Sequence, residues 1–120
     1  MKSIEEIIKT PPVVSGDFAS IDRVWACFDV AEKDRTYKIL FATYGYGSYD
    51  GDAWVLAEKD GQLFEVRGGH CSCYGLEGQF DPEPVVLKEL ENRLTKGSFL
   101  KDDYYGYDGA DTKLKTFLGL

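Results

Sequence analysis

The clearest pattern of hydrophobic and polar positions lies in residues 53–68, where two apolar segments flank Asp60-Gly61. An Asp-Gly pair is typical of a two-residue type I′ turn, because both central positions of that turn require a positive φ. The turn also fixes which residues face each other, starting with Lys59 opposite Gln62. The pattern therefore predicts an antiparallel β-hairpin over residues 53–68 with a defined register.

The predicted register gives the hairpin two unlike faces. The face that we expect to pack on the core carries four apolar side chains, which are Val55, Ala57, Phe64 and Val66. The other face is mixed and is expected at the surface, with Trp54, Leu56, Glu58, Leu63, Glu65 and Arg67. Trp54 lies opposite Arg67 in this register, which predicts a cation–π contact between the two strands.

A helix is predicted over residues 82–96. Asp81 is a suitable N-cap, and Pro82 suits the first helical position because the N–H that it lacks would be unsatisfied there. Phe80 and Val85 occupy the two positions of a hydrophobic staple. The stripe expected to be buried consists of Val86, Leu87, Leu90 and Leu94, and Gly97 is expected to end the helix.

Shorter helices are predicted near both termini. Residues 3–9 begin with a capping box, in which the side chains of Ser3 and Glu6 each satisfy a backbone N–H. The last helix is expected to begin near Ala110, with Leu114, Phe117 and Leu118 on its apolar face.

Residues 20–30 are compatible with two structures. Ser20 is a good N-cap for a helix whose stripe is Ile21, Val24, Trp25 and Phe28. The same residues also suit a buried strand that turns at 32–35 into the next segment. We favour the helix because its cap and its stripe agree.

Residues 36–44 are rich in β-branched and aromatic side chains and predict a strand, and the glycines of residues 45–52 then predict a loop. Residues 1–120 are the length of a single domain. Together these elements predict an α+β fold. Its antiparallel sheet of three to four strands is centred on the hairpin at 53–68 and is packed by helices at 82–96 and near both termini.

The composition is that of an acidic globular protein. The 14 Lys and Arg against 21 Asp and Glu give a net charge of −7, and aromatic residues make up 14% of the chain. Direct binding to nucleic acid is not expected, because it requires clustered basic side chains. No run of residues is apolar enough for a membrane span, and the first 20 residues do not resemble a secretory signal, so we expect a cytoplasmic location.

Two segments combine tyrosine, aspartate and glycine, at 46–52 and at 102–109. Tyrosine provides a large contact area at a small entropic cost, and aspartate attracts basic partners. We therefore expect these segments to form a binding surface, whose candidate residues are Tyr46, Tyr49, Asp50, Asp52, Tyr104, Tyr105 and Asp108. Closing the ends of the sheet would also explain the tyrosines.

The only histidine stands next to two of the three cysteines, which leaves several kinds of chemistry open. His70, Cys71 and Cys73, with Cys27 as a fourth ligand, have the donor atoms of a zinc site, although the Cys-x-Cys spacing is shorter than usual. A cysteine nucleophile with His70 as its base is a second reading. A third is purely structural, with small thiols packed beneath a glycine-rich crossover.

The same segment resembles a motif of small uncharacterised proteins from tailed bacteriophages, and the similarity extends over about residues 37–97. The motif reads His70-Cys71-Ser72-Cys73-Tyr74-Gly75-Leu76-Glu77-Gly78-Gln79-Phe80-Asp81-Pro82-Glu83. The resemblance implies a phage protein acting in the host cytoplasm, and it implies no established activity.

The function expected from these observations is binding rather than catalysis. A small acidic phage protein is expected to bind a host protein and inhibit or modify it, and defence systems are one class of target. The partner is expected to have a basic surface, including one that normally binds nucleic acid. The alternative is a small zinc-binding or cysteine-dependent protein that uses His70, Cys71 and Cys73.

Overall fold

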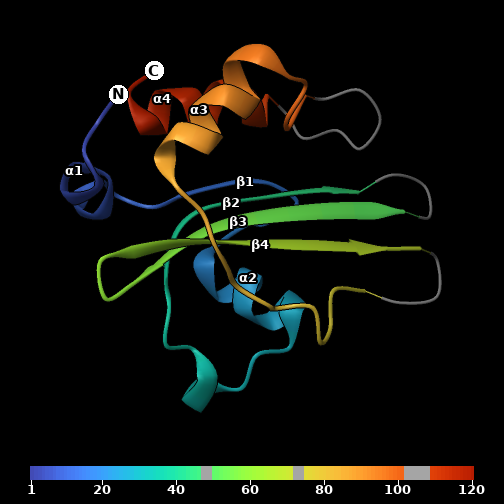
Figure 1. Ribbon diagram of the computed structural model, residues 1–120. Coiled ribbons are helices and arrows are strands. Elements are labelled where there is room, and N and C mark those ends of the chain that lie inside the picture. The colour runs from blue at the N-terminus through green and yellow to red at the C-terminus, as the bar shows by residue number, and fades with distance from the viewer. Residues whose placement is uncertain (47–49, 72–74, 102–108) are drawn as a thin grey trace.

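The computed structural model describes residues 1–46, 50–71, 75–101 and 109–120, with the side chain of Tyr46 excepted. Its centre is a five-stranded mixed sheet in the order β1-β2-β3-β4-β5 (Figure 1). The strands are β1 (Val13–Gly16), β2 (Lys38–Tyr46), β3 (Gly51–Lys59), β4 (Gln62–His70) and β5 (Glu83–Pro84). The helices are α1 (Ile4–Lys9), α2 (Ile21–Phe28), α3 (Leu87–Lys96) and α4 (Ala110–Leu118), with a short 3₁₀ helix at Glu32–Asp34.

The hairpin of β3 and β4 has the predicted register. Lys59 pairs with Gln62 and Trp54 pairs with Arg67, and Asp60 and Gly61 have φ values of 55° and 81°. The hairpin is longer than predicted, since its pairing continues to Gly51 opposite His70. The α+β class is confirmed, while the sheet has five strands and is mixed rather than purely antiparallel.

The additional strand is β1, which pairs parallel to β2 and was not predicted. Val13 lies opposite Phe41 and Gly16 lies opposite Tyr44. The sequence did not indicate this strand, because Pro11-Pro12, which follow α1, are typical of a break in regular structure. The predicted loop at 45–52 is also shorter, because Gly45 pairs with Asp52 and extends β2 and β3.

Both faces of the hairpin are buried, which corrects the prediction of a mixed surface face. Trp54 is 2% exposed and Leu63 is 1% exposed. They belong to one hydrophobic cluster with residues of α3 and α4, whereas Val55 and Val66 belong to a second cluster with residues of α2. Figure 1 shows this three-layer arrangement, with α3 and α4 on one side of the sheet and α2 on the other.

The helix predicted over residues 82–96 begins later, at Leu87. The residue before a proline is pushed toward extended backbone, and Pro82 and Pro84 each impose this. Glu83 and Pro84 accordingly form β5, paired with Glu65 and Phe64 of β4. Asp81 is therefore not the N-cap. Val86 occupies that position, without a side-chain cap and 62% exposed, while Leu90, Leu94 and the C-cap Gly97 lie as predicted.

The hydrophobic staple predicted between Phe80 and Val85 is also wrong. The Phe80 ring packs on α2 instead, with its centroid 5.0 Å from Trp25 and 5.6 Å from Phe28. Val85 is buried in the cluster on the opposite side of the sheet. The crossover therefore contacts both layers of the core before α3 begins.

The other helices agree with their sequence signals. Ser3 and Glu6 form the capping box of α1. Of the two structures considered for residues 20–30, the helix is found: α2 has Ser20 as its N-cap and buries Val24, Trp25 and Phe28. The last helix begins at Ala110 and buries Leu114, Phe117 and Leu118.

A buried carboxylate connects α3 to the sheet. The Glu65 side chain is 7% exposed and accepts hydrogen bonds from Trp54 Nε1 at 2.9 Å and from both terminal nitrogens of Arg93 at 2.8 and 3.0 Å. Arg67 Nε donates to the same carboxylate at 3.3 Å. Burial raises the pKa of Glu65, but the hydrogen bonds from Arg93 and Trp54 and the two arginine charges outweigh it, so the pKa lies below its ordinary value.

This network replaces the predicted cation–π contact between Trp54 and Arg67. Arg67 is paired with Glu65, and the ring of Phe99 on this side of the sheet has Arg93 over it, at 5.4 Å from the ring centroid. The predicted surface residue Glu65 is thus an internal bridge.

We predict that Arg93→Ala lowers the free energy of unfolding by roughly 3 kcal/mol, because it leaves a buried carboxylate without its bidentate partner. Arg67→Ala is the matched control, and it should cost less than about 1 kcal/mol because the Arg67 side chain is 65% exposed. Urea denaturation of both variants measures the difference. Equal losses would contradict the assignment of Arg93 as the principal partner of Glu65.

The same comparison has a predicted pH dependence. Because the folded-state pKa of Glu65 is lowered, its stabilising contribution is present above the unfolded pKa and is lost as the pH falls through the folded pKa. The gap in stability between wild type and Arg93→Ala should therefore narrow below about pH 4. A gap that stays constant down to the acid transition would show that the ion pair does not contribute.

Candidate functional site

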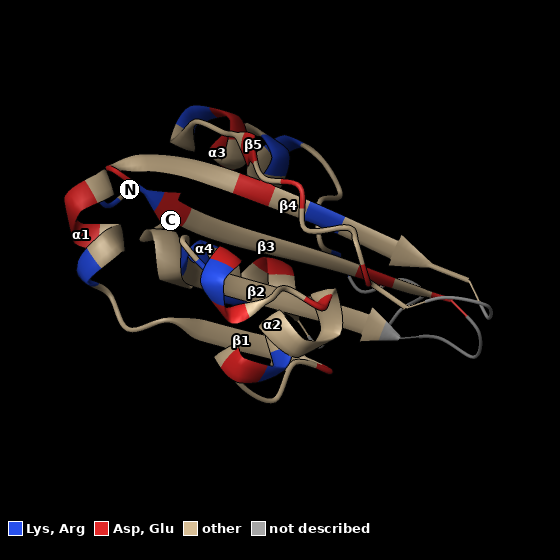
Figure 2. Cartoon of the chain, turned by 90° about the horizontal axis from the view of Figure 1, so that it is seen from below, with Lys and Arg blue, Asp and Glu red and all other residues tan. Residues whose placement is uncertain are grey.

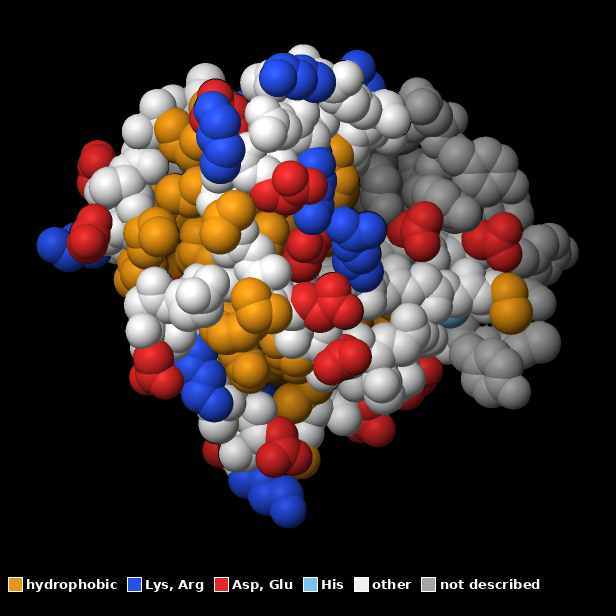
Figure 3. Space-filling model, in the orientation of Figure 1, with side chains coloured by type: hydrophobic (Ala, Val, Ile, Leu, Met, Phe, Trp, Pro, Cys, Tyr) orange, Lys and Arg blue, Asp and Glu red, His pale blue; other side chains and the backbone are white. Residues whose placement is uncertain are grey.

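The ends of three strands meet at one end of the sheet. Tyr46 of β2 pairs with Gly51 of β3, and Gly51 pairs with His70 of β4. Asp50 directly precedes β3, and Asp52 is its second residue. Figure 2 shows acidic positions in β3 toward this end, and in Figure 3 acidic side chains stand there while the basic side chains drawn lie elsewhere on that face. Two of the predicted binding residues, Asp50 and Asp52, are therefore brought together.

The remaining candidates of the predicted binding surface are less fully placed. Tyr46 is placed by its backbone alone, as the last residue of β2. Four candidates lie outside the described residues, namely Tyr49, Tyr104, Tyr105 and Asp108. The described residue Leu100, which precedes one of these segments, lines the same pocket as Asp52.

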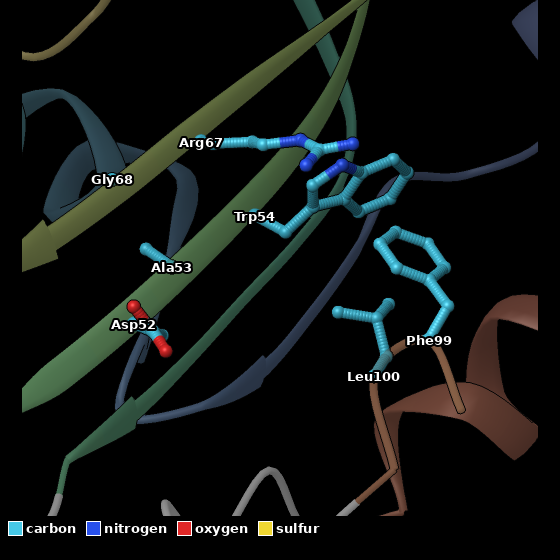
Figure 4. Close-up of a pocket in the computed structure, with 7 residues that line it drawn as sticks. All are labelled: Asp52, Ala53, Trp54, Arg67, Gly68, Phe99 and Leu100. Carbon is cyan, nitrogen blue, oxygen red and sulfur yellow. The ribbon is translucent and has the colours of Figure 1, made fainter. Parts of the chain in front are cut away.

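That pocket lies on the side of the sheet covered by α3 and α4. It has a volume of about 260 Å³, and its described lining consists of Asp52, Ala53, Trp54, Arg67, Gly68, Phe99 and Leu100. Figure 4 shows Phe99 and Leu100, from the segment after α3, approaching Trp54 from the side opposite the sheet. The Trp54 and Phe99 rings are 5.1 Å apart between centroids and nearly perpendicular, at 88°. The pocket therefore has an aromatic wall.

Asp52 supplies the carboxylate of the pocket. Its side chain is half-buried, and no residue of the described chain forms a hydrogen bond or an ion pair with it. Gly69 provides the space beside it, since a Cβ at Gly69 would lie 2.9 Å from Asp52 Oδ1. Arg67 extends along Trp54 and away from Asp52 (Figure 4). The Asp52 carboxylate therefore lies at the pocket and is not paired with a basic residue of the described lining.

The electrostatic environment of Asp52 disfavours its charged form. Burial raises the pKa of Asp52, the nearby His70 lowers it, and the neighbouring Asp50 raises it again, with a net upward shift. A perturbed carboxylate in a pocket is a mark of functional sites, because a fold rarely retains such a residue for stability. A cationic group placed in the pocket would favour the charged form of Asp52 and oppose both causes of the shift.

His70 lies on the opposite face of the sheet from Asp52. Its Nε2 forms a short hydrogen bond with the hydroxyl of Tyr44, a residue of the cluster beneath α2, and its Nδ1 lies 3.0 Å from the carbonyl oxygen of Cys71. A Cβ at Gly51 would overlap the His70 ring and lie 2.9 Å from Tyr44 Cε1, so this glycine allows the ring to lie across the strand. Within the described chain, the hydrogen bond of His70 with Tyr44 links β4 to β2.

Three of the four predicted zinc ligands lie in the described chain, and they do not form a metal-binding group there. Cys27 is on α2, where Arg23 Nη2 lies 3.7 Å from its sulfur, and Cys71 is exposed just after β4. Cys73 lies outside the described residues. In the ranges that the structure describes, no three His, Cys, Asp or Glu residues form a group that would hold a metal ion.

The crossover after β4 contains a residue whose role the sequence pattern did not indicate. Gln79 accepts a hydrogen bond from the backbone N–H of Gly69 at 2.8 Å and donates to the carbonyl oxygen of Gly75 at 2.9 Å. Leu76 is 1% exposed and lies against Gly68, where a Cβ would be only 2.9 Å from its methyl carbon. The described part of this segment therefore has a structural role, because Gln79 and Leu76 hold the crossover against β4.

Sequence reasoning also missed the aromatic wall, because it treated Trp54 as a surface residue. A signal was available, since Asp52 and Trp54 are two apart on one strand and share a face. No comparable signal pointed to Phe99 or Leu100, which reach the pocket through the packing of α3.

Comparison with protein-family models, with curated proteins and with solved structures finds no match for this chain. No helix in the described ranges has the length and apolar character needed to cross a bilayer.

We predict that Asp52→Asn raises stability at neutral pH. The folded-state pKa of Asp52 is raised, so its ionised form costs stability above that pKa, and the cost disappears as the pH falls through it. The advantage of the variant in urea denaturation should therefore be present at pH 7 and absent below about pH 4. The exposed Asp34→Asn is the control, and a variant no more stable than wild type at pH 7 would contradict the prediction.

Proposed function

We propose that this protein acts by binding a basic surface of another protein through the acidic end of its sheet. The observation that carries the proposal is Asp52, a half-buried carboxylate without a hydrogen-bond or ion-pair partner in the described chain, placed beside Asp50 at an aromatic pocket. Stabilising such a residue requires a positive group, and the described pocket lining provides only Arg67, which is paired with Glu65.

The composition supports the same kind of partner. A chain with a net charge of −7 attracts basic surfaces over distances up to about 10 Å at moderate salt. Surfaces that normally bind nucleic acid are the most strongly basic, so a nucleic-acid-binding protein is a suitable target. The interaction would block that surface without any chemical step.

The proposed surface includes the two tyrosine-rich segments of the sequence, at 46–52 and 102–109. Tyr46 and Asp50 flank one segment, and Leu100 precedes the other. Asp52 and Leu100 line the same pocket, so the described chain approaches both segments from one region. We assign Tyr49, Tyr104, Tyr105 and Asp108 to the surface on this basis, since tyrosine and aspartate side chains are suited to an adaptable contact area.

The setting of the proposal comes from the resemblance to small phage proteins. We propose that the partner is a protein of a bacterial host, located in the host cytoplasm, and that binding inhibits or modifies it. Host defence proteins that act on nucleic acid have the required basic surface, and a phage would benefit from inhibiting them.

The proposal predicts that neutralising the acidic end abolishes capture of the partner. Asp50→Asn combined with Asp52→Asn should weaken capture from bacterial lysate by at least about tenfold at low salt, because charge-assisted contacts are lost. Quantitative mass spectrometry of the captured proteins measures the change, and the captured protein should carry a basic surface.

The matched control is Glu32→Gln combined with Asp34→Asn. It removes the same charge from the exposed 3₁₀ helix, away from the proposed surface. Capture that survives the Asp50/Asp52 variant, or that falls equally with the control, would overturn the proposal, because the interaction would then not depend on this end of the sheet.

A further inference from the structure

We infer that the pocket lined by Asp52, Trp54 and Phe99 receives one arginine side chain of the partner and that the guanidinium pairs with Asp52. The inference rests on the proposed function, because it names the group by which a basic partner is held. It follows from the size of the pocket, from the absence of a partner for Asp52 in the described chain, and from the aromatic wall.

The size of the pocket suits a side chain. Its volume of about 260 Å³ is below the roughly 300–1,000 Å³ typical of sites for drug-sized ligands or cofactors. Interfaces concentrate their energy on a few anchor residues that fill such pockets, and arginine is among the commonest anchors. A single long side chain from a protein partner is therefore the best-fitting occupant.

The charge in the pocket selects a cation with several donors. Both oxygens of Asp52 are without hydrogen-bond partners in the described chain, and Asp52 lines the pocket. A carboxylate with two available oxygens matches the parallel N–H groups of a guanidinium, whereas an ammonium contacts it as a point charge. The bound cation would also offset the repulsion between Asp52 and Asp50.

The aromatic wall adds a preference for a flat cation. Guanidinium groups stack on aromatic rings and are more weakly hydrated than ammonium groups. The wall already shows this behaviour, because the guanidinium of Arg93 lies over the Phe99 ring at 5.4 Å from its centroid. Arg93 and Arg67 are both held by Glu65 and so do not neutralise Asp52.

The test uses N-acetyl-L-arginine methylamide as the probe and N-acetyl-L-lysine methylamide as the comparison. Nitrogen–proton NMR spectra report the indole N–H of Trp54, and Trp25, on the opposite side of the sheet, provides an internal reference. We expect the arginine probe to shift the Trp54 signal saturably, with a dissociation constant on the order of 1 mM, as befits one isolated side chain. The lysine probe should bind more weakly, and Trp25 should not move.

Variants locate the probe. Asp52→Asn should weaken binding of the arginine probe about tenfold, while Asp50→Asn, which does not line the pocket, should weaken it less. Phe99→Leu keeps an apolar wall but removes the ring, so it should reduce the preference for arginine over lysine. Asp52→Glu retains the charge and should bind better than Asp52→Asn, which separates recognition from any effect on folding.

Several outcomes would overturn the inference. They are an unmoved Trp54 signal, equal binding of the arginine and lysine probes, or equal losses in the Asp50 and Asp52 variants. A shift caused instead by N-acetylglycine would assign Arg67 as the recognition group and would also overturn it. If the probe fails but capture still depends on Asp50 and Asp52, the inference falls and the proposed function stands; if the probe binds but no basic protein is captured, the proposed function fails.

Discussion

The structure depends on one buried carboxylate more than on any other polar group. Glu65 lies in the middle of β4 and holds Trp54 on the sheet and Arg93 on α3 in a single network. Arg93 in turn supports Phe99, which closes the pocket over Trp54. A charge inside a protein is tolerated only when it is fully paired, so the network fixes α3 in one position on the sheet. The Glu65–Arg93 ion pair, which lies outside the candidate site, therefore positions the aromatic wall of the pocket.

The elements predicted correctly were those with a strong local cause. Asp60-Gly61 determined the hairpin register because only certain residues accept its backbone angles, and Ser20 selected helix over strand by capping it. The predictions that failed needed long-range information. Val13–Gly16 is a strand only because β2 offers it a partner, and the face that carries Glu65 is buried because α3 and α4 pack on it.

The candidate site was predictable to a similar extent. The sequence pattern indicated Asp50 and Asp52 through their acidic, glycine-rich surroundings, and the structure places both at one end of the sheet. It did not indicate Phe99, because a lone aromatic residue after a helix carries no signal of what it covers. The His70 segment attracted attention for its unusual composition, yet in the described chain His70 and Gln79 hold strands and crossover together.

The prolines beside the edge strands have a consequence for how the molecule behaves in a crowded solution. An open sheet edge invites further strands from other chains, and this is a common route to aggregation. The two edge strands are β1 and β5. Pro84 lies in β5 and Pro11-Pro12 directly precede β1, so a residue that cannot donate a backbone hydrogen bond lies at or beside each edge. The prolines thus discourage sheet growth at both edges, and they direct contact with other proteins toward the strand ends and their side chains.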